Sequence, residues 1–120
     1  MFLGRSKVSF LYLNRSKITG LSKKTFVGLS GLKELHLDHN KLVSLGGGQF
    51  EDLPNLEVLY LNNNHLQFIN VTSLNNLYML KMLCLHNNRQ GKLWGGECDL
   101  CNQVYGNRLC KENVQRGNCE

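Results

Sequence analysis

The sequence contains one proline and no long hydrophobic run, and these absences exclude several classes of protein. With twelve glycines and a single proline among 120 residues, the chain is neither collagen-like nor proline-rich. No stretch approaches the roughly 20 apolar residues that span a bilayer, so we expect no membrane insertion. Residues 1–4 are too short for a signal peptide, and the last residues show no hydrophobic tail typical of a lipid anchor.

The chain also lacks the residue patterns that mark many enzymes. No combination of serine, histidine and aspartate suggests a catalytic triad, and no paired carboxylates suggest a catalytic cleft. The glycines at 46–48 are not followed by the Lys-Ser or Lys-Thr pair of a phosphate-binding loop, so we interpret them as a flexible loop. The sequence therefore predicts a protein that is not an enzyme and uses no cofactor.

Charge is spread unevenly along the chain, although the net charge is only +5. Residues 1–41 carry eight basic side chains and two acidic ones, whereas residues 42–80 carry three acidic side chains and no basic ones. Residues 81–120 carry six basic and four acidic side chains. Two basic ends thus flank an acidic middle, and such ends attract anionic partners. The alternative interpretation is a surface that serves solubility alone.

A repeat of 24 residues runs through most of the chain and is its strongest signal. The units begin at Val8, Leu32, Leu56 and Leu80. Each complete unit has apolar residues at its first, fourth, sixth, eleventh and fourteenth positions. The fourth and sixth positions alternate with period two, which predicts a short strand with one buried face. We expect three full units and a fourth strand.

Asparagine recurs at the ninth position of the units, as Asn40, Asn64 and Asn88. An asparagine there can satisfy backbone groups where the strand turns away, so stacked copies should form a buried ladder. Ligand binding by these residues is the less favoured alternative. Ser16 takes this position in the first unit, and its shorter side chain should leave the first turn less well satisfied.

Four of the five cysteines lie in the last 23 residues, as Cys98, Cys101, Cys110 and Cys119. An even-numbered terminal cluster suggests two local disulfides and an oxidising compartment, so we expect a secreted or extracellular protein that does not bind nucleic acid. A zinc site is the alternative, but only one C-x2-C pair is present. The fifth cysteine, Cys84, should point outward from the sheet, to pack against the terminal segment or to form an intermolecular disulfide.

The units resemble the typical leucine-rich repeat, L-x-x-L-x-L-x-x-N-x-L-x-x-L-x-x-x-x-F-x-x-L-x-x. The resemblance covers residues 8–93 and implies an α/β leucine-rich-repeat solenoid, a short horseshoe. Such a solenoid has a parallel concave β-sheet and a convex side of mostly loop or 3-10 structure. Residues 94–120 look like the cysteine-rich C-terminal cap of extracellular leucine-rich-repeat proteins. The expected organisation is therefore a short N-terminal segment, residues 1–7, then the repeats, and then this cap. The combination resembles the variable lymphocyte receptors of jawless vertebrates and their invertebrate-chordate relatives.

The resemblance to these caps also implies a disulfide pairing. Their cysteines usually pair first with third and second with fourth, which gives Cys98 with Cys110 and Cys101 with Cys119. No cysteine-bearing cap precedes Val8. The first strand would then present an open edge unless Phe2 and Leu3 fold over it, so a homodimer through this edge is a further hypothesis.

In this architecture, residues between the strand leucines point outward and form columns across strands about 4.8 Å apart. Tyrosine, histidine and asparagine there suit the recognition of proteins and sugars, although tyrosine also packs well in strands for structural reasons. Two expected columns are Phe10, Glu34, Val58, Met82 and Tyr12, His36, Tyr60, Cys84. Two more are Asn14, Asp38, Asn62, His86 and Arg15, His39, Asn63, Asn87. The histidines lie too far apart to predict a metal site.

A second expected binding surface lies around the cap. In variable lymphocyte receptors the C-terminal cap contacts antigen, so the resemblance points to the basic residues Lys81, Arg89, Lys92, Arg108, Lys111 and Arg116. Asn14 and Asn70 begin N-x-S/T sequons and are possible glycosylation sites.

The sequence and the resemblance together predict a non-catalytic, immune-type recognition protein. It would bind bacterial surface glycoconjugates or protein antigens through its concave face and its basic cap. The alternative is a ligand-binding fragment of an extracellular adhesion or signalling receptor that binds a host protein.

Overall fold

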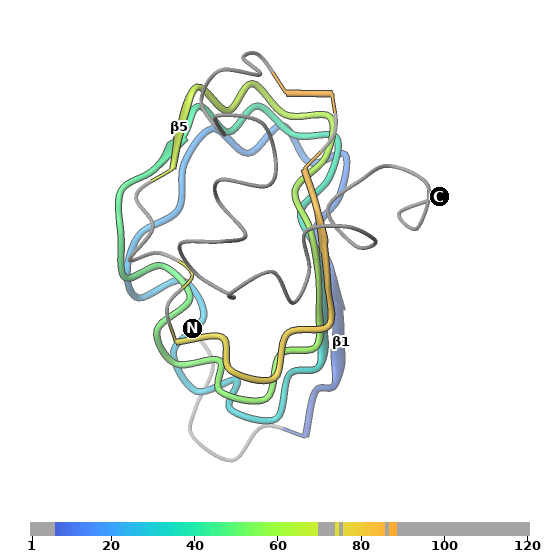
Figure 1. The fold of residues 1–120 in the computed structure, drawn as a ribbon, viewed down its shortest axis with the longest axis vertical. Helices are drawn as coiled ribbons and strands as arrows, with labels where there is room; N and C mark the ends of the chain where they lie inside the picture. Colours follow the sequence, from blue (N-terminus) through green and yellow to red (C-terminus); the bar gives the residue numbers. More distant parts are fainter. Residues whose placement is uncertain (1–6, 70–73, 75, 86, 89–120) are drawn as a thin grey trace.

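The computed structural model describes residues 7–69, 74, 76–85 and 87–88. The chain winds as a coil whose successive turns lie over one another (Figure 1), and each turn contributes short strands. The strands are β1 (Phe10–Tyr12), β2 (Glu34–His36), β3 (Ser44–Leu45), β4 (Val58–Tyr60), β5 (Phe68–Ile69) and β6 (Met82–Cys84). No helix occurs among these described residues, so none there is long and apolar enough to cross a membrane.

Four strands form a parallel sheet in the order β1-β2-β4-β6. Their register is the same at every junction: Phe10 pairs with Glu34, Glu34 with Val58, and Val58 with Met82. The step of 24 residues in the sequence is therefore also the step between neighbouring strands. The predicted parallel sheet is confirmed, and residues of one predicted column lie side by side.

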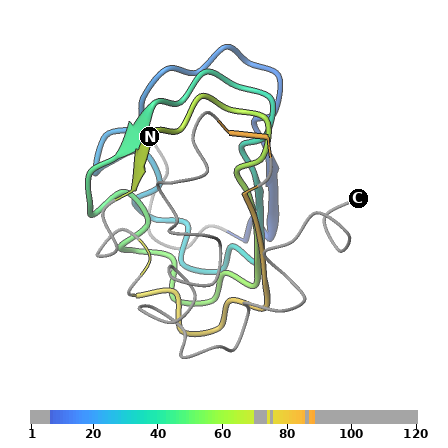
Figure 2. The same cartoon turned by 45° about the horizontal axis from the view of Figure 1, so that its top comes forward.

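A second, two-stranded sheet was not expected from the sequence. β3 and β5 pair in parallel, with Ser44 opposite Phe68 and Leu45 opposite Ile69. This pair lies on the side of the coil opposite the four-stranded sheet (Figures 1 and 2), and Figure 2 shows the successive turns as separate layers. The two sheets therefore hold neighbouring turns together at both sides of the core.

The repeated leucines fill the space between the two sheets. Leu35, Leu59 and Leu83, the central residues of β2, β4 and β6, have no exposed surface. Phe26 and Phe50 are also buried, with ring centroids 6.0 Å apart and planes at 19°. The repeat's apolar positions thus build one continuous core, as the hydrophobic effect requires of stacked units that cannot close a core alone.

The first turn closes this core less completely than the later ones. Val8, Leu11 and Leu13 pack against the core but are only partly buried, and β1 is an edge strand of the sheet. The predicted cover by Phe2 and Leu3 lies outside the described residues, and the predicted edge-to-edge homodimer stays a prediction.

The segments that return from one strand to the next run as consecutive turns. Each turn is closed by a backbone hydrogen bond from an N–H to the carbonyl oxygen three residues earlier. Examples are Leu29 N–H to Phe26 O at 3.2 Å and Leu53 N–H to Phe50 O at 3.3 Å. Gly47 and Gly48 have φ angles of 129° and 84°, values that favour glycine. The glycine run at 46–48, interpreted from the sequence as a flexible loop, therefore supplies backbone conformations just before Phe50 that other residues rarely adopt.

The predicted asparagine ladder is present, and each asparagine joins its own turn to the preceding one. The Asn64 amide donates to Leu61 O at 3.1 Å and to Leu37 O at 3.0 Å, and its oxygen accepts from Leu42 N at 3.1 Å. Asn88 makes the equivalent bonds one turn later, including Leu66 N to its Oδ1 at 2.9 Å.

The expectation that Ser16 would leave the first turn poorly satisfied is wrong. Because the ladder reaches backward, Asn40 of the second turn supplies the partners of the first. Its Oδ1 accepts from Ser16 N at 2.9 Å and Ile18 N at 3.0 Å, and its amide donates to Leu13 O at 3.0 Å. Position 16 therefore needs no amide to satisfy its own turn.

Candidate ligand-binding face

The outward face is defined here as the residues of β1, β2 and β4, and those directly after them, that point away from the core. Phe10 and Tyr12 are exposed, at 55% and 62%. Glu34, His36 and Tyr60 are partly buried, whereas the residue between each outward pair is buried in β2 and β4. The expected alternation thus puts aromatic, acidic and histidine side chains together on a rigid sheet.

Three rings of this face stack across the strands. The His36 ring centroid lies 4.4 Å from that of Tyr12 on β1 and 4.3 Å from that of Tyr60 on β4. The planes are inclined by 35° and 23° respectively. The shared register imposes this contact, since Tyr12, His36 and Tyr60 are direct partners in the sheet. His36 is therefore held in one plane between two tyrosines.

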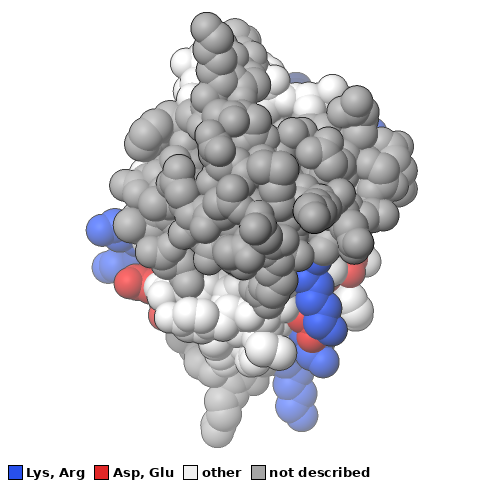
Figure 3. Space-filling model, in the orientation of Figure 1, with Lys and Arg blue, Asp and Glu red and all other residues white. Residues whose placement is uncertain are grey.

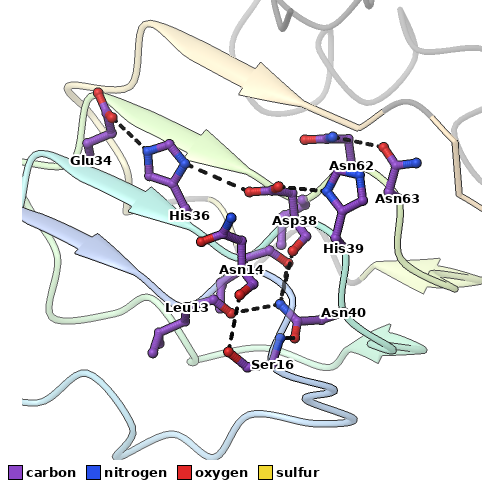
Figure 4. Close-up of polar contacts among 12 residues, drawn as sticks. Leu13, Asn14, Ser16, Glu34, His36, Asp38, His39, Asn40, Asn62 and Asn63 are labelled. Atoms are coloured by element: carbon purple, nitrogen blue, oxygen red, sulfur yellow. Dashed lines mark hydrogen bonds and ion pairs between the residues drawn. The ribbon is translucent and has the colours of Figure 1, made fainter.

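Two carboxylates flank the same histidine (Figure 4). His36 Nε2 lies 2.7 Å from Glu34 Oε1, and its Nδ1 lies 3.8 Å from Asp38 Oδ1. The other Asp38 oxygen lies 2.7 Å from His39 Nδ1. The pattern Glu-x-His-x-Asp in the sequence predicts only that the three side chains share one face, because alternate residues of an extended segment do so.

Two oxygen atoms at this site are buried and accept no hydrogen bond, Asp38 Oδ1 and Asn62 Oδ1. Asn62 is only 7% exposed, and its amide nitrogen donates to Asn63 Oδ1 at 2.9 Å. The two residues lie on adjacent turns, since His39 N donates to Asn62 O at 3.1 Å. The repeat places Asp38 and Asn62 in one column, but nothing in the sequence indicates that their oxygens lack hydrogen-bond donors.

The environment of Tyr60 raises the pKa of its hydroxyl above the ordinary value of 10.0. Burial is the largest cause, followed by the negative charges of Glu34 and Asp38 and by Tyr12. Both effects disfavour the phenolate. Tyr60 therefore keeps its proton, and a hydroxyl donor, throughout the neutral range.

We expect spectrophotometric titration to show this directly. The tyrosinate absorbance of the wild type minus that of Tyr60→Phe should give a curve centred above pH 10.0, and Glu34→Gln should lower the midpoint slightly. Because the folded pKa is raised, the associated stability is present below the unfolded pKa of about 10 and is lost as the pH rises. A difference curve centred at or below the ordinary value would contradict the geometry.

Comparison with known proteins decides the family. The family model described as "Leucine rich repeat" matches residues 1–42 and 30–89. The chain belongs to the leucine-rich repeat family. Proteins of this family are generally non-catalytic binding modules, in agreement with the absence of enzyme motifs. No curated protein sequence gives a significant match to the chain.

Solved leucine-rich repeat structures share this fold. The leucine-rich repeat domain of APL1B is 25% identical, with a TM-score of 0.66, over 74% of this chain. Human 5T4 (Wnt-activated inhibitory factor 1, trophoblast glycoprotein) is 32% identical, with a TM-score of 0.57, over 67% of this chain. The matched region makes up only 27% of the APL1B chain and 29% of the 5T4 chain.

One column of the leucine-rich repeat is set partly by the backbone. Arg15, His39, Asn63 and Asn87 all have φ near 58°. Asparagine and histidine adopt this left-handed conformation more readily than most residues. The residue types in this column therefore reflect a backbone requirement as well as any ligand, with Arg15 as the exception.

The sequence predicts two alternative roles for Cys84, packing against the terminal segment or an intermolecular disulfide. It occupies an outward position of β6, yet it is fully buried and disulfide-bonded within the single chain. The predicted pairs, Cys98 with Cys110 and Cys101 with Cys119, lie outside the described residues.

Charge on the described surface of the leucine-rich repeat is mixed. Lys81 forms an exposed ion pair with Glu57 at 3.7 Å, and Figure 3 shows basic and acidic side chains next to each other on the visible rim. In the described ranges, no three histidine, cysteine or acidic residues are placed to hold a metal ion. The other basic residues predicted around the cap lie outside those ranges: Arg89, Lys92, Arg108, Lys111 and Arg116. So do His86, predicted for the binding face, and Asn70, predicted as a glycosylation site.

Proposed function

We propose that this leucine-rich repeat chain is a recognition module that binds a protein partner through its outward face. The observation that carries the proposal is the stack of Tyr12, His36 and Tyr60 on a rigid parallel sheet, beside Glu34 and Asp38. Aromatic side chains supply contact area at low entropic cost, and histidine and carboxylates supply adaptable polar contacts.

The charge of this face favours a protein over an anionic glycoconjugate. Glu34 and Asp38 lie at its centre, and a polyanionic microbial polymer would be repelled there. The anionic ligands suggested by the basic cap would have to bind at the cap itself. The partner of the outward face is a protein, either a microbial antigen in an immune-type role or a host protein in a receptor role.

An extracellular location is part of the proposal. The disulfide at Cys84 supports it, because structural disulfides persist mainly in oxidising compartments. One structural neighbour is itself named a trophoblast glycoprotein and Wnt-activated inhibitory factor 1. That name describes the neighbour, and it is compatible with a protein-binding role for this chain.

An array of extracellular host proteins, microbial surface proteins and bacterial glycans tests the proposal. It would be probed with the wild type and with a triple variant carrying Tyr12→Ala, His36→Ala and Tyr60→Ala. A matched variant carries Val43→Ala, Glu51→Ala and Tyr78→Ala, three exposed positions outside the four-stranded sheet.

We expect the wild type to select proteins rather than glycans. The first variant should lose about 100-fold in affinity, since buried aromatic anchors dominate protein interfaces, whereas the matched variant should bind normally. Equal binding by the first variant, or selection of anionic glycans alone, would contradict the proposal.

A further inference from the structure

We infer that the centre of the outward face receives an arginine side chain of the protein partner. The acidic centre is defined as Glu34 and His36 of β2, Asp38 just after β2, and Asn62 just after β4. The inference rests on the proposed function and adds the chemistry of what is recognised. Charge, unpartnered oxygens and ring geometry each contribute to it.

The two carboxylates lack a basic partner. The ion pairs of Glu34 and Asp38 are with histidines alone, and the ion pair of Lys81 with Glu57 is the one lysine or arginine pair among the described residues. The acidic centre therefore holds two carboxylates and no lysine or arginine that pairs with them. Burial is the main cause of the raised pKa of Tyr60, and the negative charges of Glu34 and Asp38 add to it. This charge attracts a cationic side chain across an interface.

The second observation is the lack of donors at Asp38 Oδ1 and Asn62 Oδ1. Buried acceptors nearly always have a donor in folded proteins. The Asn62 amide cannot simply be reversed, because its nitrogen already donates to Asn63 Oδ1 at 2.9 Å. Figure 4 shows the Asn62 oxygen on the side away from Asn63, above Asp38. An incoming donor group would satisfy oxygens on two adjacent turns.

Both oxygens are buried in this structure. A donor therefore reaches them when neighbouring side chains change rotamer, as is common when proteins bind. His39 contacts the other oxygen of the same carboxylate, Asp38 Oδ2, at 2.7 Å, and its side chain is 33% exposed. The backbone of the sheet need not move.

Guanidinium fits this set of acceptors better than ammonium does. Its five N–H donors lie in one plane and can meet carboxylate and amide oxygens together, whereas ammonium is a compact point charge. Guanidinium also stacks on aromatic rings, and Tyr12 next to the acidic centre is 62% exposed. A sugar is less suited, because the His36 ring is already stacked on both sides.

The test uses the intact chain and four capped tetrapeptides, composed of arginine, lysine, citrulline or glutamine. Affinities are measured at low ionic strength by calorimetry, with circular dichroism to verify folding. We expect tetra-arginine to bind roughly fivefold more tightly than tetra-lysine, and citrulline and glutamine peptides not to bind. Glu34→Gln and Asp38→Asn should each weaken tetra-arginine binding about tenfold.

Glu51→Gln is the matched control, since it removes the same charge at an exposed position outside the sheet. The inference is overturned if citrulline binds as well as arginine, or if Glu51→Gln has the same effect as Glu34→Gln. It is also overturned if maltohexaose binds with this variant dependence and tetra-arginine does not bind. If the peptides fail but an array ligand still depends on Tyr12, His36 and Tyr60, the proposed function stands without the arginine.

Discussion

Replacing Asn64 with alanine should lower the free energy of unfolding by about 3 kcal/mol, a large share of the stability of a small domain. Asn64 is 4% exposed, and its side chain is the hydrogen-bond partner of the buried Leu42 N. The change leaves that N–H without its acceptor and removes one of two amide donors from each of Leu37 O and Leu61 O. Urea denaturation followed by circular dichroism measures the loss.

Asn55→Ala is the matched control for this prediction. Asn55 is exposed and makes a single bond, from its amide to Ser30 O at 2.8 Å. Water can replace that bond, so we expect a change below about 1 kcal/mol. Equal effects of the two substitutions would show that the ladder does not hold neighbouring turns together.

Replacing Phe50 with alanine should cost about 3–5 kcal/mol, the usual range for removing a buried aromatic ring. Phe50 has no exposed surface and stacks on Phe26 of the preceding turn, so the cavity would open between two turns. Stacked units depend on their neighbours, and we expect loss of cooperativity as well as stability. The midpoint and slope of the same urea transition report both.

Two further substitutions sharpen this prediction. Phe50→Leu should cost only about 1 kcal/mol, because the third unit has a buried leucine, Leu74, at the same position. Phe10→Ala removes the same ring from an outward position that is 55% exposed, and should also cost about 1 kcal/mol. A loss at Phe10 equal to that at Phe50 would contradict the assignment of inward and outward positions.

The sequence predicted the frame of the site because one repeat unit makes one turn of the coil. Once Leu35 and Leu59 are equivalent, the alternation within a strand places His36 and Tyr60 on the opposite face. The structure confirms that register. The leucines and the asparagine ladder were predictable for the same reason. Each turn has the same core to fill and the same backbone groups to hydrogen-bond.

Features that do not recur in every turn were harder to predict. The pairing of β3 with β5 involves only two residues in each strand, which is too short for a visible alternation. The contact of His36 with Glu34 and Asp38 depends on side-chain rotamers. The unpartnered oxygen of Asn62 depends on which way its amide faces, and that is fixed by Asn63.

Cys84 shows why an odd cysteine is difficult to place from sequence. The alternation put it on the outward face, and its column with Tyr12, His36 and Tyr60 is confirmed by the register. The structure buries Cys84 completely, which the alternation within the strand did not predict. Tyr60 is the last ring of the stack, and it is partly exposed.

Single alanine substitutions over the whole described surface, measured against the strongest array ligand, test the central claim most directly. Our account predicts that affinity falls at least tenfold at Tyr12, Tyr60 and Asp38, where aromatic and charged anchors concentrate the binding energy. It predicts changes below about twofold at exposed positions outside the four-stranded sheet, such as Val43 and Glu51. Losses concentrated at those outside positions, with normal binding by the outward-face variants, would contradict it.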